Sequence, residues 1–132
     1  MRVLVYGKIF PDSFARNIAA TVEQMGHCVR ALEESPNHRR LIFPAVEARR
    51  HRRLLRAAKE LDPDLTLLTD GTVPPAVMDQ LKLVNNGKIA AWYPDHLANL
   101  GRQYLLASDF DACFFKDPYM AEQFRDKLGI NA

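Results

Sequence analysis

Residues 64–93, DLTLLTDGTVPPAVMDQLKLVNNGKIAAWY, contain the patterns of a strand, a helix and a second strand in succession. The apolar runs 64–70 and 87–93 have the length of strands, while residues 74–84 carry apolar side chains at helical spacing. Pro74 and Pro75 favour the start of this helix, because the first helical turn tolerates proline. The succession predicts a βα unit of a parallel sheet.

The same alternation extends toward both ends of the chain. We expect further strands at 2–7, 27–32 and 110–116, with helices between them. Asp12 or Ser13 caps the first helix, which ends at Gly26, and the last helix covers 118–129 and ends at Gly129. A chain of 132 residues has the size of one domain. The predicted fold is α/β: a single Rossmann-like doubly wound domain, residues 1–132, with a five-stranded parallel sheet flanked by helices.

Composition restricts the class of protein further. With 48% hydrophobic and 26% charged residues, the chain has the composition of a globular domain. No stretch approaches the roughly 20 apolar residues of a membrane span, and the apolar run before Lys8 is too short for a signal peptide. We therefore expect a cytoplasmic protein. Cys28 and Cys113 lie in apolar stretches without C-x-x-C spacing, which predicts buried free thiols and no metal site.

A strongly basic, amphipathic helix is predicted at 45–61, AVEARRHRRLLRAAKEL. One face is apolar, and the other faces carry Arg49, Arg50, Arg52, Arg53 and Arg56. A solvated outer face is the simpler interpretation, and no specific nucleic-acid recognition is expected. The alternative is docking to an anionic surface, which contributes about 1 kcal/mol per basic residue next to anionic lipid.

Doubly wound sheets bind ligands in a crevice beyond the carboxyl ends of their strands. The residues that follow the predicted strands are mostly polar or small, and several are expected to converge in one cleft. They are Gly7, Lys8, Glu33, Glu34, Ser35, Thr69, Asp70, Gly71, Thr72, Tyr93, Pro94, Asp95, His96, Lys116 and Asp117.

Dinucleotide binding would require a G-x-G-x-x-G loop after the first strand, so that the backbone can approach a pyrophosphate. The loop here is GKIFPDS, residues 7–13, in which only Gly7 fits. Ile9, Phe10 and Pro11 would obstruct that approach. The sequence thus argues against a nicotinamide or flavin enzyme.

A second possibility rests on two motifs. PDLTLLTDG (63–71) resembles the phosphoacceptor strand of response-regulator receiver domains, and ACFFKDP (112–118) resembles their fifth strand with its lysine. The resemblance implies Asp70 as acceptor and Lys116 as its partner. Receivers also take an acidic pair for Mg²⁺ from the end of strand one, where this chain has YGK (6–8). A receiver-like or other non-catalytic binding or signalling module is therefore kept as the alternative.

Three longer segments carry another resemblance: PDLTLLTDGTVPPAVMDQLK (63–82), GKIAAWYPDHLANL (87–100) and FDACFFKDPYMAEQFRDKLGI (110–130). Together they resemble the N-terminal domain of CgeB-like (spore maturation protein) glycosyltransferases of the GT-B fold. The resemblance implies the acceptor-binding half of an enzyme whose C-terminal donor domain is absent here. The complete enzyme would use a nucleotide sugar, and this chain alone would hold no cofactor and would not catalyse transfer.

The residues of the cleft receive roles under this interpretation. Transfer to a hydroxyl is helped by a base within hydrogen-bond reach, and Asp95 with His96 is the expected catalytic pair. Asp95 alternatively caps a helix. Trp92 or Tyr93 would supply an apolar platform for a sugar or glycan acceptor, although strand alternation lets only one of them face a given side. Trp92 alternatively packs in the core. The remaining predicted substrate-binding residues are Gly7, Lys8, Asp70, Gly71, Thr72 and Lys116.

The two functions differ in the surface that they require. The acceptor half of a transferase should expose an apolar face toward its missing partner. A self-sufficient binding module should bury its apolar core fully.

Overall fold

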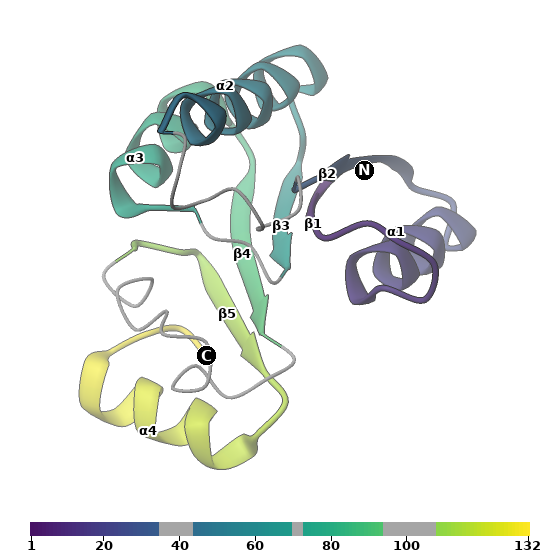
Figure 1. The fold of residues 1–132 in the computed structure, drawn as a ribbon. Coiled ribbons are helices and arrows are strands. Elements are labelled where there is room, and N and C mark those ends of the chain that lie inside the picture. The colour runs from purple at the N-terminus through teal and green to yellow at the C-terminus, as the bar shows by residue number, and fades with distance from the viewer. Residues whose placement is uncertain (35–43, 70–72, 94–107) are drawn as a thin grey trace.

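The computed structural model describes residues 1–34, 44–69, 73–93 and 108–132. Strands and helices alternate within these ranges (Figure 1). In chain order they are β1 (Arg2–Gly7), α1 (Phe14–Gln24), β2 (Cys28–Glu33), α2 (Pro44–Leu61), β3 (Leu65–Thr69), α3 (Pro75–Val84), β4 (Lys88–Tyr93), β5 (Ala112–Phe115) and α4 (Pro118–Leu128). Their bounds lie close to the predicted ones, and the predicted α/β class is confirmed.

The five strands form one parallel sheet in the order β2-β1-β3-β4-β5. This confirms the predicted five-stranded parallel sheet, flanked by helices in a Rossmann-like doubly wound arrangement. The strand order reverses at β1, because the chain passes from β1 to β2 on one side and then crosses to β3 on the other. The carboxyl ends of β1 and β3 therefore border the topological switch point, where sheets of this kind bind ligands.

The helices are distributed unequally over the two faces of the sheet. On β1, Leu4 and Tyr6 join the core that α2 and α3 cover, whereas Val3 and Val5 pack with Ala15 of α1. The core under α4 includes Tyr93, which lies on the same side of β4 as the residues beneath α3. Figure 1 shows α2, α3 and α4 on one side of the sheet and α1 on the other.

Local signals define the ends of α1 and α4. The side chain of Ser13 accepts a hydrogen bond from the backbone N–H of Arg16, which decides between the two predicted caps of α1. Asp117 caps α4 by accepting from the N–H of Tyr119 at 2.9 Å. Past α4, the chain returns to β5, where the carbonyl of Asn131 accepts from the N–H of Cys113 at 2.7 Å. The amide of Asn131 also donates to the carbonyl of Asp111 at 2.6 Å.

Two predictions of burial are wrong. Cys28 is exposed, because it is the first residue of β2 at the edge of the sheet. Arg50 is only 7% exposed, because it lies one helical turn before Leu54 on the face of α2 that packs on the sheet. The other cysteine, Cys113, is buried as predicted, and its burial raises the pKa of the thiol to about 11.

Asp111 connects the start of β5 to β4. Its carboxylate accepts from Lys88 Nζ at 2.8 Å and from the backbone N–H of Ile89 at 2.8 Å. These hydrogen bonds, that of Lys88 first, lower the pKa of Asp111 from its ordinary value of 3.8. The ionised carboxylate therefore favours the folded state.

The effect of Asp111 on stability should depend on pH. Because its folded-state pKa is lowered, its contribution is present above the ordinary pKa and is lost as the pH falls through the folded-state pKa. We expect Asp111→Asn to lower the free energy of unfolding by about 1 kcal/mol at neutral pH and by much less near pH 2, both measured by urea denaturation. Asp126→Asn, an exposed change in α4, is the control. An equal loss at both pH values would contradict the expectation.

Candidate functional site

The switch point is closely packed at the ends of β1 and β3. Gly7 is buried there, and a Cβ added to it would lie 2.0 Å from Thr69 Oγ1 and 3.0 Å from Ala15 Cβ. Thr69 is fully buried, and its hydroxyl donates to the carbonyl of Tyr6 at 3.4 Å. Gly7 thus allows β1, β3 and α1 to approach one another, and the partly exposed Lys8 is the first residue at the rim.

Trp92 and Tyr93 at the end of β4 point to opposite faces of the sheet, as strand alternation predicts. Tyr93 is 3% exposed, lies in the core under α4 and stacks on Phe115 with ring centroids 6.0 Å apart. Trp92 is 38% exposed on the face that carries α1. Of the two, Trp92 is the side chain that a ligand can reach.

Trp92 lies between two phenylalanine rings. Phe14, the first residue of α1, meets it edge-on with centroids 5.3 Å apart, and Phe114 of β5 is 5.7 Å away. We call Phe14, Trp92 and Phe114 the aromatic face. Phe114 is 50% exposed, and Phe10 in the loop before α1 is 55% exposed.

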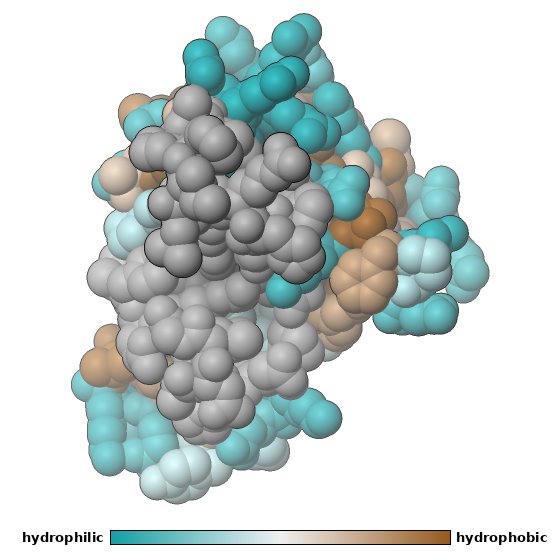
Figure 2. Space-filling view, in the orientation of Figure 1, coloured by the Kyte–Doolittle hydropathy of each residue, from teal (hydrophilic) through white to brown (hydrophobic). Residues whose placement is uncertain are grey.

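The aromatic face is on the side of the sheet that α1 occupies alone among the described helices. Figure 1 shows α1 beside β1, with no described helix over β4 and β5 on that side. Figure 2 shows hydrophobic atoms gathered next to α1 on the surface in view. A contiguous apolar surface of this kind is typical of a site for a ligand or a partner.

The predicted site residues that the structure describes lie at the ends of three strands. Gly7 ends β1 and Lys8 follows it, Trp92 on the aromatic face and the buried Tyr93 end β4, and Lys116 is exposed after β5. Two strands separate β1 from β5, so that their ends are about 14 Å apart at the usual strand spacing. Lys8 and Lys116 therefore do not meet in one compact site, although an extended ligand could contact both.

Several predicted site residues lie outside the described residues. These are the expected catalytic pair, Asp95 and His96, and the turn formed by Asp70, Gly71 and Thr72.

Sequence reasoning missed the partners of Trp92. Phe114 is directly opposite Trp92 in the register of β4 and β5, and Phe14 comes from the opposite end of the chain. The alternation of side chains in ACFFK (112–116) could have indicated one of these partners, because it places Phe114 and Phe115 on opposite faces of the sheet.

The arginines predicted to form a basic face of α2 differ in their exposure to solvent. Arg50 is buried, whereas Arg49, Arg52, Arg53 and Arg56 are exposed. Arg53 and Arg56 also border a pocket with Arg30 of β2, a residue that the pattern of α2 alone does not indicate.

Within the described ranges, no three His, Cys, Asp or Glu side chains are grouped so that they could hold a metal ion. No helix in the described part of the chain has the length and apolar character to cross a membrane. The sequence matches none of the protein-family models and none of the curated proteins with which it was compared.

Proposed function

We propose that this chain is the acceptor-binding half of a sugar-nucleotide-dependent glycosyltransferase and that Trp92 holds a ring of the sugar or glycan acceptor. The observation that carries the proposal is the exposure of Trp92 between Phe14 and Phe114 at the carboxyl end of β4. Ligand sites combine aromatic surface with a few polar groups, and indole adds an N–H donor to a broad apolar ring. Lys8 at the neighbouring switch point would supply a polar contact.

The exposed apolar surface also supports an incomplete enzyme. Phe10, Trp92 and Phe114 would be costly to leave in water on a self-sufficient module. In the proposed enzyme, this side of the sheet faces the cleft and the second, donor-binding domain. The chain would bind an acceptor alone but would not transfer sugar without that domain.

The proposed chemistry assigns the base to Asp95 and His96. The pair accepts the proton of the acceptor hydroxyl, while the oxygen of that hydroxyl forms a bond to the anomeric carbon of the donor sugar. The nucleotide leaves with the electron pair of the broken bond and is held by the donor domain. No metal is assigned to this half.

One observation favours the alternative of a receiver-like or other binding module. The strand order β2-β1-β3-β4-β5 is that of flavodoxin-like sheets, which include receiver domains. However, β1 ends in Tyr6 and Gly7 rather than in the carboxylates that Mg²⁺ requires. The order of the sheet is therefore compatible with this alternative, while the end of β1 argues against a phosphoryl switch.

The single tryptophan of the chain allows a direct test. We expect neutral oligosaccharides to change the fluorescence of Trp92 on titration. Trp92→Ala should weaken their binding, measured by calorimetry, about tenfold, or about 1.4 kcal/mol, and Trp92→Phe should retain part of it. Tyr119→Ala removes another exposed aromatic ring, on α4, and should bind as the unchanged protein does.

Either of two results would count against the proposal. One is the absence of any oligosaccharide response in the unchanged protein. The other is equal binding by the unchanged protein and Trp92→Ala when both have the same unfolding temperature.

A further inference from the structure

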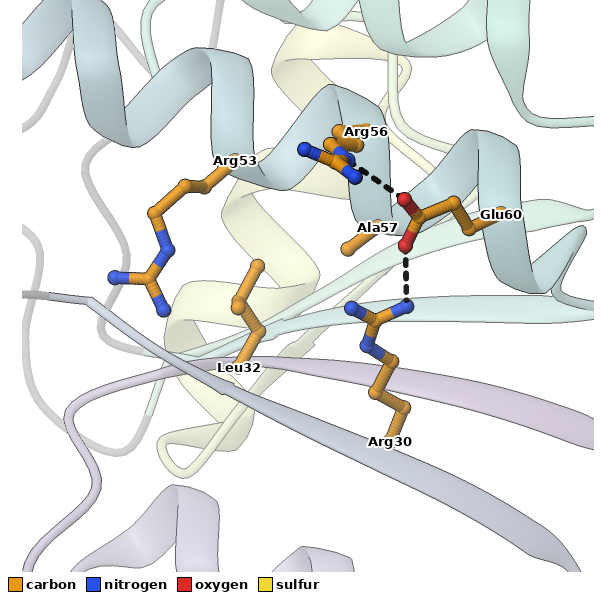
Figure 3. A pocket seen from close by; sticks show the side chains of 6 residues that line it. All are labelled: Arg30, Leu32, Arg53, Arg56, Ala57 and Glu60. Carbon is orange, nitrogen blue, oxygen red and sulfur yellow. Dashed lines mark hydrogen bonds and ion pairs between the residues drawn. The ribbon is translucent and has the colours of Figure 1, made fainter.

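A pocket of about 250 Å³ lies between β2 and α2 (Figure 3). It is on the face of the sheet opposite to the aromatic face, because Leu32 and Ala57 belong to the core that α2 and α3 cover. Its lining residues are Arg30, Leu32, Arg53, Arg56, Ala57 and Glu60.

One carboxylate holds two of the three arginines in this pocket. Glu60 accepts from Arg30 Nη1 at 3.1 Å through Oε2 and from Arg56 Nε at 2.6 Å through Oε1. The hydrogen bonds from Arg56 and then from Arg30 lower the pKa of Glu60, which therefore stays ionised at neutral pH. Each guanidinium has five N–H donors, so that both arginines keep donors for a ligand.

Arg53 is on the other side of the pocket. In Figure 3, Leu32 and Ala57 lie between its guanidinium and the ion-paired side chains of Arg30, Arg56 and Glu60. Within the described residues, no carboxylate forms an ion pair with Arg53. Leu32 and Ala57, which are 8% and 1% exposed, make an apolar floor between the two positive groups.

The charges of the lining residues do not balance. Three guanidinium groups and one carboxylate leave an excess of two positive charges. Arginine binds phosphate through paired N–H groups, and a phosphate monoester carries a charge of about −1.5 to −2 at neutral pH. Such a dianion would neutralise the excess, whereas a neutral sugar would not.

We propose that this pocket binds the phosphate group of a phosphomonoester. Arg53 and the remaining donors of Arg30 contact the phosphate oxygens, and Glu60 is a positioning residue that holds Arg30 and Arg56. The part of the ester next to the phosphate packs on Leu32 and Ala57. This site is independent of the proposed glycosyl transfer, because it is on the opposite face of the sheet.

The test uses phenyl phosphate as the probe, because it joins a phosphomonoester to an apolar ring. We expect Arg53→Gln to weaken its binding at least about tenfold in calorimetric titrations of the full chain. Arg52→Gln removes the same charge from the preceding residue of α2, which does not line the pocket. It should change the affinity less than about twofold.

The source of the phosphate group is distinguished by a second arm. Phosphatidylcholine vesicles with added phosphatidate present the same phosphomonoester on a membrane. If phenyl phosphate binds, and its binding depends on Arg53 but not on Arg52, the ligand is a small soluble ester. If only the vesicles bind, with the same dependence on Arg53, the ligand is a lipid headgroup. The proposal is overturned if neither probe binds, or if the two variants lose affinity equally and so reveal only the diffuse charge of α2.

Discussion

Gly7→Ala is expected to lower the free energy of unfolding by about 3 kcal/mol, the upper part of the range for an overpacked core. The added Cβ would lie 2.0 Å from Thr69 Oγ1 and 2.7 Å from the carbonyl oxygen of Thr69. The hydroxyl can rotate away, but the carbonyl belongs to the backbone of β3, a central strand. Relief therefore requires β1 and β3 to separate at the switch point.

Urea denaturation of two further variants identifies the cause. Gly26 has a φ of +83° and no atom near an added Cβ, so that Gly26→Ala should cost only the strain of the left-handed backbone, about 1 kcal/mol. The double variant Gly7→Ala, Thr69→Ala should be less destabilised than the sum of its single changes, because the hydroxyl contact is absent. A loss for Gly7→Ala no larger than that for Gly26→Ala would show that the strands are not in such close contact.

Leu54→Ala is expected to cost about 3 kcal/mol, within the range for a buried leucine cut to alanine. Leu54 is fully buried in α2, in the core that includes Leu4 of the sheet and Met78 of α3. Truncation removes apolar contacts within this core, which the sheet, α2 and α3 share, and leaves a cavity that the parallel sheet beneath α2 can fill only partly.

Leu83→Ala is the matched control for this change. Leu83 is on α3 and is 85% exposed, so its truncation should alter the free energy of unfolding by no more than about 0.5 kcal/mol. Both variants are compared by urea denaturation, in which Leu54→Ala should lower the midpoint and keep the slope. A small loss for Leu54→Ala would mean that α2 is not packed on the sheet at this position.

The elements of this fold follow from local patterns, which is why their bounds could be predicted. The strand predicted at 2–7 has the same bounds as β1. Ser13 caps the N-terminus of α1, a position at which serine is common. The order of the strands is a different matter. Alternating strands and helices predict a parallel sheet, but the direction of each crossover is set by packing between distant segments.

The errors also have physical causes. Charge predicted an exposed Arg50, yet its position one turn before Leu54 directs it toward the sheet. Apolar neighbours predicted a buried Cys28, yet burial of a strand residue depends on its place in the sheet, and β2 is an edge strand. Local composition does not contain either of these tertiary facts.

For the candidate site, alternation predicted that Trp92 and Tyr93 would face opposite ways, and this is confirmed. Which of them would be accessible depended on the side that α4 covers. The contact with Phe14 depended on the crossover that places α1 near β4. The roles of Asp95 and His96 stay predictions, because these residues lie outside the described ranges.

The return of the chain to β5 also affects the behaviour of the protein at high concentration. An edge strand with free N–H and carbonyl groups is a template on which another molecule can add a strand, and such addition leads to aggregation. At the β5 end of the sheet, the N–H of Cys113 and the carbonyl of Asp111 are already hydrogen-bonded to Asn131. Asn131 therefore hinders intermolecular strand pairing at the start of this edge, a form of self-association that the buried core alone would not prevent.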